Sequence, residues 1–370
     1  MKPEILITCG GTGGHIYPGL AVGRMLQAQG CEIRFMGSDS RMEKDKIPAE
    51  GFAFVGLPVQ QLRKNQPVRS LKMLWNCIRM ARQNLRKQRP VAVLGLGSYI
   101  TVPAIVAAWQ EKIPVILLET NVVPGKANQY LARIAKAVAL AHAETEKYLP
   151  AGPLSRVTGS PIRPEILEGS REAGFKRFQL DAHCKTVSLI GGSQGAQRLN
   201  LALLRALPEL LALENLQIVH VCGASNEAAV REAAGEYAIH PRYRLLNYVD
   251  DMPDLLACTD LVISRAGASS IAELLACQIP SILIPGSFGG GHQLDNAQVL
   301  DQAGAAILFS EAQLEQGALG TVIRDVITDT ERLGKMRENC SRLNSPLAAE
   351  KVAQLVLEMI STPKEEAFAC

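Results

Sequence analysis

The fold of this chain is decided by residues 5–20, which read ILITCGGTGGHIYPGL. The first five of these residues form a short apolar run of the kind that makes a buried strand in a parallel sheet. Four of the next five residues are glycines, and beyond Pro18 the apolar residues recur with helical spacing. The stretch therefore predicts a strand, a glycine-rich loop that carries His15, and a helix.

The composition of this glycine loop suits a bound phosphate. Glycines let a ligand approach the backbone closely and accept positive φ values, and the following helix N-terminus adds unpaired N–H groups and a partial positive charge. The loop is not a Walker loop, because no Gly-Lys-Ser/Thr follows, and Ile16 stands where the dinucleotide fingerprint requires Gly or Ala. A tight strand-to-helix turn without a ligand remains an alternative from this stretch alone.

The length and composition are those of a soluble globular protein with two domains. The chain has 370 residues, of which 47% are hydrophobic and 20% are charged. Its nine cysteines are scattered, without a C-x-x-C pair or a Cys/His cluster at zinc spacing. We expect reduced, mostly buried thiols in a cytosolic protein, and no signal peptide, because the N-terminus runs straight into the first strand.

Residues 91–110 are uncharged and could be mistaken for a membrane span. They contain Gly95, Gly97 and Pro103, and they are typical of a strand, a turn and a helix. A break in the backbone that faces lipid would leave polar groups without partners. No membrane span is therefore predicted here.

Residues 60–90 form a basic segment in an otherwise mildly acidic chain. The segment contains no acidic residue. It lies on one helix and the approach to that helix, outside any recognised nucleic-acid module, so no nucleic-acid partner is expected. Its nine basic residues are Arg63, Lys64, Arg69, Lys72, Arg79, Arg82, Arg86, Lys87 and Arg89.

The helix predicted at residues 68–88 has an apolar face that we expect to be buried. Trp75 lies at the border of this face, and Lys72, Arg79 and Arg82 share its side. An indole flanked by cations suits a membrane interface with anionic lipid. The alternative is a tryptophan half-buried at a domain edge among solvated cations. The predicted buried face consists of Leu71, Leu74, Ile78, Ala81 and Leu85.

Strands and helices alternate along the chain, and the pattern repeats after a stiff linker, GSPIRP, at residues 159–164. This predicts an α/β protein with two Rossmann-like, doubly wound parallel sheets, and a ligand would lie in the cleft between the domains if the strand edges that bind ligands face each other. We expect an N-terminal domain at residues 1–160, a C-terminal domain at residues 164–345, and a helix at residues 346–361 that packs back on the first. The predicted strands are residues 5–9, 31–37, 52–57, 91–95, 114–118, 137–141, a short one near 157, 186–190, 217–222, 243–246, 261–264 and 281–284.

Eight motifs follow one another along the chain: GGTGGHIYPGLAV, GLGSYITVP, ETNVVPGKAN, TGSPIR, GGSQGA, VDDM, RAGASSIAE and HQLDNA. From residue 5 to about residue 360, the chain resembles the MurG family of GT-B glycosyltransferases, the UDP-N-acetylglucosamine:lipid I N-acetylglucosaminyltransferases of peptidoglycan synthesis. The resemblance implies inverting transfer of N-acetylglucosamine to the muramoyl 4-hydroxyl of undecaprenyl-linked lipid I, giving lipid II, with no cofactor. It also implies a peripheral position on the cytoplasmic face of the bacterial inner membrane, in agreement with the Trp75 helix and an anionic membrane surface.

His15 is the candidate general base. A sugar hydroxyl is a weak nucleophile until its proton is removed in the transition state, and imidazole titrates near neutral pH. Alternatively, His15 only donates a hydrogen bond to the diphosphate. A variant that loses turnover but keeps its donor affinity would favour the base.

The resemblance places further residues on the donor. Arg163 could reach the diphosphate through its forked donors, or it is a solvated hinge residue. Glu273 would bind the ribose hydroxyls, although the S-x-x-E sequence that ends in Glu273 also reads as a capping box. No acidic cluster or DxD motif occurs where a metal would bridge the diphosphate, so no metal is expected. The implied substrate-binding residues are Thr12, Gly13 and Gly14 in the first loop, Asn121 and Gln293 for the sugar, Gly192, Ser193 and Gln194 at the first helix N-terminus of the second domain, Val249 for uracil, and Ala268, Ser269, Ser270, Ile271 and Ala272 before Glu273.

Three motifs depart from the usual pattern of this family. Ser98 and Thr101 replace a Gly and a Ser in the second glycine turn, Thr120 replaces a Gln, and Ser269-Ser270 replaces Leu-Thr. These departures leave the details of donor and acceptor contacts open. Two other functions are also open: a UDP-N-acetylglucosamine 2-epimerase with the same two-domain plan, and a noncatalytic nucleotide-sugar-binding protein at the membrane.

Overall fold

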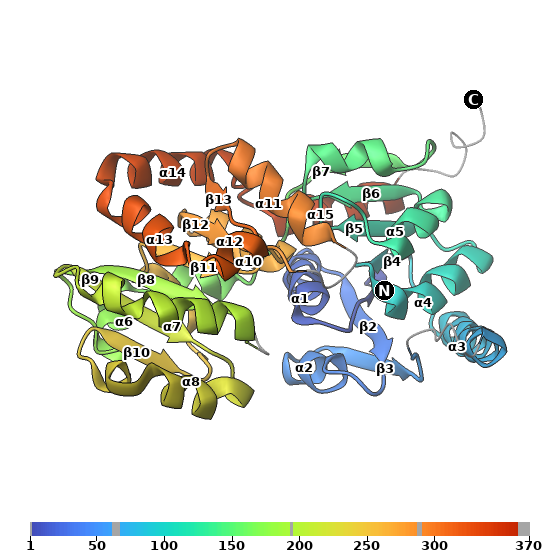
Figure 1. The fold of residues 1–370 in the computed structure, drawn as a ribbon. Coiled ribbons are helices and arrows are strands. Elements are labelled where there is room, and N and C mark those ends of the chain that lie inside the picture. Colours follow the sequence, from blue (N-terminus) through green and yellow to red (C-terminus); the bar gives the residue numbers. More distant parts are fainter. Residues whose placement is uncertain (1, 61–66, 193–194, 287–290, 362–370) are drawn as a thin grey trace. The chain divides into compact units, whose positions relative to one another are not determined.

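The computed structural model describes residues 2–60, 67–192, 195–286 and 291–361. The chain divides into two compact units (Figure 1). Unit 1 comprises Met1–Arg163 and Ser345–Cys370, and unit 2 comprises Pro164–Asn344. Unit 1 is therefore built from both ends of the sequence.

Unit 1 is organised around a seven-stranded parallel sheet with the order β3-β2-β1-β4-β5-β6-β7. The direction of winding reverses between β1 and β4, where Ile5 of β1 lies opposite both Ile33 of β2 and Ala92 of β4. The strands are β1 (Glu4–Thr8), β2 (Glu32–Ser38), β3 (Ala53–Leu57), β4 (Ala92–Gly95), β5 (Val115–Glu119), β6 (Ala137–Leu140) and β7 (Leu154–Val157).

Helices cover both faces of this sheet, because successive residues of each strand point to opposite sides. Ile5 and Ile7 are fully buried with α1 and α15, whereas Leu6 is buried with α3 and α4. The helices of unit 1 are α1 (Gly13–Ala28), α2 (Glu43–Ala49), α3 (Pro67–Lys87), α4 (Ser98–Gln110), α5 (Lys126–Leu131) and α15 (Ala348–Ser361), with short 3-10 turns η1 (Ala132–Ile134) and η2 (Ala143–Tyr148).

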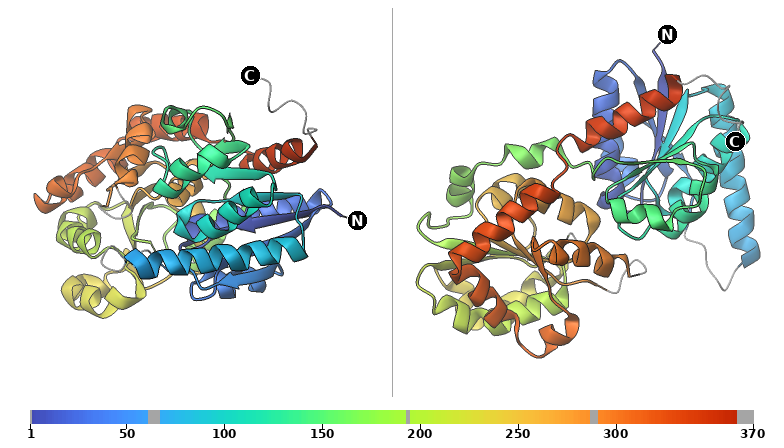
Figure 2. Two further views of the ribbon diagram at one scale, coloured as in Figure 1. Left: turned by 90° about the vertical axis from the view of Figure 1, so that its right-hand side faces the viewer. Right: turned by 90° about the horizontal axis from the view of Figure 1, so that it is seen from above.

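The final helix, α15, belongs to unit 1. Figure 2 shows it in red alongside α1 in blue, and Val352 is fully buried in the cluster that α1 shares. The Ser345 hydroxyl donates to the carbonyl of Thr158 at 2.9 Å, and Lys136 Nζ donates to the carbonyl of Met359 at 2.8 Å. The chain therefore returns to its first sheet after completing unit 2.

Unit 2 contains a six-stranded parallel sheet with the order β10-β9-β8-β11-β12-β13, and its winding reverses between β8 and β11. The strands are β8 (Lys185–Ile190), β9 (Leu216–Val221), β10 (Tyr243–Leu246), β11 (Leu261–Ser264), β12 (Ser281–Leu283) and β13 (Ala306–Leu308). The helices are α6 (Arg171–Arg177), α7 (Gln197–Leu211), α8 (Glu227–Ala234), α9 (Met252–Ala257), α10 (Ala268–Ala276), α11 (His292–Gln302), α12 (Glu311–Glu315), α13 (Leu319–Thr328) and α14 (Thr330–Leu343), with 3-10 turns η3 (Pro164–Glu168), η4 (Ala224–Asn226) and η5 (Gly235–Ile239).

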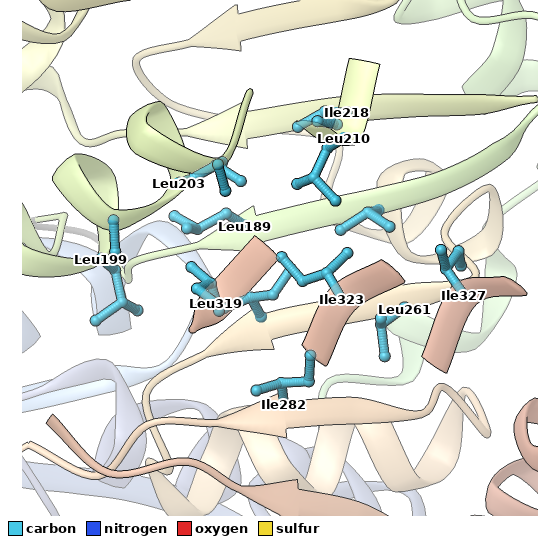
Figure 3. Packing of buried hydrophobic residues seen from close by; sticks show 14 of the residues in the cluster. Leu189, Leu199, Leu203, Leu210, Ile218, Leu261, Ile282, Leu319, Ile323 and Ile327 are labelled. Atoms are coloured by element: carbon cyan, nitrogen blue, oxygen red, sulfur yellow. The ribbon is translucent and has the colours of Figure 1, made fainter. Parts of the chain in front are cut away.

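The main core of unit 2 lies between one face of its sheet and the helices α7 and α13 (Figure 3). Leu189 of β8 and Leu261 of β11 are fully buried there together with Leu203 of α7 and Ile323 of α13. This packing fixes the two central strands, β8 and β11, and thereby the starting points of the loops that follow them.

The predicted fold class is confirmed: the chain forms two doubly wound parallel sheets. Every predicted strand with stated bounds agrees with the observed strand to within one residue at each end. Strand β13 and helices α2, α6, α9, α12, α13 and α14 were not predicted.

No described helix is long and apolar enough to cross a membrane, and residues 91–110 form β4, a turn and α4 as predicted. The eight cysteines within the described ranges are free, and seven of them are buried.

Helix α3 matches the predicted helix, but the prediction of its buried face was partly wrong. Leu71 is 64% exposed, and the buried residues are Cys77, Ala81 and Leu85. Leu74 and Ile78 are only half-buried. Packing against the rest of unit 1 becomes complete only from the middle of the helix, so periodicity alone overestimated the buried stripe.

Candidate active site

Each sheet has one position where the winding reverses, and a glycine-rich loop follows a strand at both positions. In unit 1 this places the loops after β1 and β4 side by side, and in unit 2 it does the same for the loops after β8 and β11. Open α/β sheets bind ligands at such a position, beyond the carboxyl ends of the strands. Each glycine loop therefore lies where its own sheet is expected to bind a ligand.

The loop after β1 is closely packed. A Cβ atom on Gly10 would lie 2.2 Å from Oε1 of Glu43, so only glycine fits. Gly11 has a φ of 89°, and a Cβ atom there would lie 3.3 Å from Oγ of Ser98. The loops after β1 and β4 therefore touch each other.

His15 lies in the first turn of α1, and not in the loop as predicted. Helix α1 begins at Gly13 with Thr12 as its N-cap residue, and the N–H of His15 donates to the carbonyl of Thr12 at 3.1 Å. The two preceding glycines, Gly13 and Gly14, belong to the helix. The helix therefore starts earlier than its apolar pattern suggests, since glycine is permitted in the first turn as well as in a loop.

The imidazole of His15 is held at one nitrogen and placed among acidic groups. Its Nδ1 lies 3.2 Å from the hydroxyl of Thr12. Burial lowers the pKa of His15, while the negative charges of Glu119 and Glu43 act in the opposite direction. The imidazole is therefore mainly neutral at pH 7, which is the form that can accept a proton.

Asn121 is oriented by Glu119, the last residue of β5. Oε1 of Glu119 accepts hydrogen bonds from both the backbone N–H and Nδ2 of Asn121 at 2.9 Å, and its Oε2 accepts from Nδ2 of Asn128 at 2.9 Å. Glu119 was not predicted as a site residue, although its place at a strand end, two residues before Asn121, was a usable signal. Thr120 is buried.

The second glycine loop follows β8 and precedes α7. Because α7 begins at Gln197, Gly192 lies in the loop several residues before the helix, and not at its N-terminus as predicted. Gly192 is exposed with a φ of 81°. Ser193 and Gln194, which were also predicted to bind substrate, lie outside the described residues. Gly195 has a φ of 71°, and a Cβ atom there would lie 2.1 Å from the carbonyl oxygen of Cys222.

The start of helix α10 decides whether Glu273 belongs to a capping box. Its N-cap residue is Gly267 and its first residue is Ala268, so Ser270 lies inside the helix and the capping-box interpretation of Glu273 is wrong. Glu273 is half-buried. Of the other predicted residues of this run, Ser269 and Ala272 are half-buried, Ser270 is exposed and Ile271 is buried.

Three other predicted site residues have defined surroundings. Val249, after β10, is buried. Oε1 of Gln293, in the first turn of α11, accepts a hydrogen bond from the N–H of Gly286 at 2.8 Å, so one of its polar atoms already holds the loop after β12. The guanidinium of half-buried Arg163 lies 4.4 Å from the ring centroid of Tyr17, so its side chain is held against α1.

Helix α3 presents an apolar stripe with cations beside it. Val68, Leu71 and Trp75 are 65%, 64% and 65% exposed, and their spacing places them on one side of the helix. The guanidinium of Arg79 lies 5.5 Å from the Trp75 ring centroid. We call Val68, Leu71, Lys72, Trp75 and Arg79 the α3 stripe.

One of the three cations predicted beside Trp75, Arg82, is already paired. Arg82 and Arg86 both form ion pairs with Glu111, and these hydrogen bonds lower the pKa of the Glu111 carboxyl. Arg63 and Lys64 lie outside the described residues. The described part of the chain contains no group of three or more His, Cys, Asp or Glu side chains that could hold a metal ion.

The comparisons with known proteins first define a class. Residues 5–140 match the N-terminal domain of glycosyltransferase family 28, and residues 186–355 match its C-terminal domain. The glycotransferase of kitacinnamycin has the same fold, with a TM-score of 0.70 at 15% identity over 97% of this chain and 100% of that chain. A putative UDP-N-acetylglucosamine 2-epimerase from Listeria monocytogenes also shares it, with a TM-score of 0.73 at 14% identity over 100% of both chains. The fold with the family match defines a GT-B glycosyltransferase.

Full-length relatives narrow this class. The UDP-N-acetylglucosamine–N-acetylmuramyl-(pentapeptide) pyrophosphoryl-undecaprenol N-acetylglucosamine transferase of Halothermothrix orenii is 36% identical over 363 residues, covering 95% of this chain and 98% of the relative. The enzyme of the same name from Moorella thermoacetica is 34% identical, covering 97% and 100%. The crystal structure of MurG from Acinetobacter baumannii has a TM-score of 0.79 at 26% identity, covering 96% of this chain and 99% of that chain. This chain belongs to the MurG family of glycosyltransferases, as its motifs predicted.

Proposed function

We propose that this protein transfers N-acetylglucosamine from UDP-N-acetylglucosamine to the muramoyl 4-hydroxyl of undecaprenyl-linked lipid I, giving lipid II for peptidoglycan synthesis. The observation that carries the proposal is identity above 30% over nearly the full length of enzymes named for this transfer. The 2-epimerase shares only the fold, at 14% identity.

His15 acts as the general base in this proposal. The hydroxyl oxygen of the acceptor attacks the anomeric carbon, its proton passes to the imidazole, and UDP leaves with the electrons of the glycosidic bond. A single displacement of this kind inverts the anomeric carbon. Support comes from the lowered pKa of His15, which keeps the imidazole neutral at pH 7. In the tautomer whose Nδ1–H donates to the Thr12 hydroxyl, Nε2 is the nitrogen that takes the proton. Asn121, oriented by Glu119, would bind the sugar.

Unit 2 binds the donor in this proposal. The N-terminal ends of α7 and α10 follow β8 and β11, the two strands at the reversal, so their partial positive charges act on the same edge of the sheet. The diphosphate of the leaving UDP gains negative charge as the bond breaks, and fixed dipoles there stabilise the transition state most. Glu273 would bind the ribose hydroxyls and Val249 the uracil. Arg163, the last residue of unit 1 before the chain enters unit 2, would bind the diphosphate.

The transfer is tested by mixing the purified protein with radiolabelled UDP-N-acetylglucosamine and a lipid I analogue. We expect label in a lipid-linked disaccharide, and none when the lipid I analogue is omitted. Release of a sugar altered at C2 would instead indicate the epimerase. Binding of UDP-N-acetylglucosamine without any product would indicate a noncatalytic binding protein.

The α3 stripe is proposed to bind an anionic membrane surface on the cytoplasmic side of the inner membrane. Three exposed apolar side chains and two cations on one side of a helix suit the boundary between headgroups and acyl chains. A lysine or arginine near such a surface contributes about 1 kcal/mol. Helix α3 is therefore expected to lie on the membrane without crossing it.

Vesicles that contain phosphatidylglycerol test this surface by cosedimentation. We expect Trp75→Ala to weaken binding, and Arg79→Ala to weaken it about fivefold. Arg86→Ala is the matched control, because the charge of Arg86 is already paired with Glu111. Equal losses for Arg79→Ala and Arg86→Ala would contradict a specific role of the stripe.

A further inference from the structure

Glu43 is a fully buried carboxylate beside the first glycine loop. It is the first residue of α2. Its Oε2 accepts a hydrogen bond from the N–H of Gly11 at 3.1 Å, and its Oε1 accepts one from the N–H of Ser38 at 3.0 Å. Burial of a carboxylate is costly unless its oxygens are hydrogen-bonded, so these two contacts fix its position firmly. Glu43 thereby joins the loop after β1 to the end of β2.

The backbone around Glu43 is built to admit it. A Cβ atom on Gly10 would lie 2.2 Å from Oε1 of Glu43, and a Cβ atom on Gly37 would lie 2.9 Å from its Cγ. Gly10 ends the turn out of β1, whereas Gly37 lies in β2. Gly10 in the loop after β1 and Gly37 in β2 therefore leave the space that the side chain of Glu43 fills.

The charge of Glu43 also reaches His15. The charged groups that act on the pKa of His15 are Glu119 at the end of β5 and Glu43 on α2, and both favour the protonated imidazole against the effect of burial. Cys9 directly follows β1, and its thiol stays neutral. Burial raises the pKa of this thiol, and the negative charge of Glu43 raises it further by a smaller amount. Arg163 contacts Tyr17, two residues beyond His15.

We propose that Glu43 is a positioning residue for the transfer: by holding the N–H of Gly11, it fixes the start of α1 and so places the imidazole of His15 at the acceptor hydroxyl. The inference rests on the proposed function, because it assumes that His15 receives the proton. Glu43 itself touches neither substrate in this scheme. Its influence on the reaction passes through the backbone and through its charge.

Glu43→Gln tests the proposal with almost no change of volume. The amide has one acceptor oxygen, so its NH₂ group must face one of the two N–H donors that the carboxylate served. We expect kcat to fall about 100-fold from misplacement of His15, with little change in the KM for UDP-N-acetylglucosamine. The pKa of His15, followed by NMR titration of labelled imidazole, should fall because a negative charge is gone, and the acidic limb of kcat/KM should move to lower pH.

Two further variants separate positioning from general destabilisation. Glu43→Asp keeps the charge but shortens the side chain, so it should leave the His15 titration near that of the wild type while kcat stays reduced. Asp260→Asn is the matched control in unit 2, since Asp260 is also a buried carboxylate and accepts a backbone N–H, that of Thr186, at 2.8 Å. It should lower the free energy of unfolding without changing the titration of His15.

A folded Glu43→Gln protein with wild-type kcat or with an unchanged His15 titration would overturn the proposal. The same titration shift in Asp260→Asn would also overturn it. If Glu43→Gln does not fold, the kcat of Glu43→Asp tests the proposal instead. A wild-type kcat in Glu43→Asp would exclude a role of Glu43 in positioning His15. Absence of transfer by the wild type would defeat the proposed function and, with it, a role of Glu43 in transfer. The titration of His15 needs no substrate, so it would still decide whether Glu43 acts on His15.

Discussion

The two glycine loops occupy the same topological position in two similar sheets, but they are held by different chemistry. The loop after β1 is held by the carboxylate of Glu43, and the helix that follows carries His15 within the field of two acidic side chains. Beside the loop after β8, two amides hold the carbonyl of Cys222, directly after β9: Asn200 and Asn226 donate to it at 2.9 and 3.0 Å, and a Cβ atom on Gly195 would lie 2.1 Å from the same oxygen.

This difference has a consequence for ligands. Carboxylates near a loop repel a diphosphate but favour a group that takes up a proton. Amides beside a loop carry no net charge, and a helix N-terminus that follows the loop favours an anion. The comparison therefore favours proton transfer in unit 1 and diphosphate binding in unit 2, although both units begin with a strand, a glycine loop and a helix.

The largest effect is expected for His15→Ala. Loss of a general base should lower kcat by roughly 10²–10⁴-fold, while the affinity for UDP, measured by calorimetry, should stay near that of the wild type. His183→Ala, at an exposed histidine of unit 2, is the control. Parallel losses of kcat and UDP affinity would show instead that His15 binds the diphosphate, and the division between the two loops would fail.

Gly195→Ala tests the second loop. Both Gly195 and Gly192 have positive φ values, but only at Gly195 would a Cβ atom also meet backbone, 2.1 Å from the carbonyl of Cys222. We expect Gly192→Ala to cost about 1–2 kcal/mol in stability from its backbone conformation, and Gly195→Ala to cost more and to weaken UDP binding. Thermal unfolding and calorimetry measure both quantities. Equal costs would mean that the loop moves away from Cys222 freely.

A pH experiment sharpens the comparison further. His220, fully buried in β9, lies between the hydroxyl of Tyr243 at 2.8 Å and Oδ1 of Asn200 at 3.0 Å, so it supports the neutral contacts of the second loop. Burial lowers the pKa of His220 to about 4. The unfolded chain, with a histidine pKa near 6.5, therefore binds the proton more readily, and stability should fall as the pH drops from about 6.5 to about 4, by about 3 kcal/mol in total.

Hydrogen exchange of unit 2 peptides at pH 7 and pH 4.5 measures this loss. His220→Gln retains a donor and an acceptor but cannot titrate in this range. It should therefore show a smaller loss of protection at low pH than the wild type. An identical pH dependence in both proteins would exclude His220 as its source.

The smallest effect is expected for Ser98→Gly. Ser98 replaces a glycine that is usual in the family, and its φ of 68° lies in the left-handed region. Glycine removes a strain of about 1–2 kcal/mol there, but it adds about 0.5–1 kcal/mol of chain entropy in the unfolded state. We expect a gain in stability of about 1 kcal/mol or less, measured by urea unfolding. A clear loss would indicate that the Ser98 hydroxyl beside Gly11 stabilises the loop.

Much of the fold could be predicted from local patterns. The strands are short apolar runs bounded by glycine or polar residues, and such runs mark buried parallel strands regardless of distant contacts. Helices with weak or short patterns were missed, α2 among them, because seven residues give little periodicity. The exposed position of Leu71 was also missed, because periodicity predicts which side of a helix is apolar but not how far its partner extends.

The site could be predicted only where glycine and strand-end motifs mark it. Asn121 lies just after β5, and His15 follows the glycines after β1, so the sequence pointed to both. Glu43 was missed as a site residue, since a lone acidic residue in a polar stretch gives no sign of burial. Glu119 was missed although it ends an apolar strand two residues before Asn121. Contacts such as that of Glu43 with Gly11 join residues 32 positions apart and exist only in the folded chain.

The sequence by itself therefore determined two parallel α/β sheets, the two glycine loops and the MurG family. These features depend on the local order of apolar, glycine and polar residues, which the chain carries before it folds. Only the tertiary structure decided that His15 lies in the first turn of a helix, that a buried carboxylate holds the first loop, and that two amides hold the carbonyl of Cys222 beside the second. Charge and burial depend on which distant segments come together, and that is a property of the folded chain.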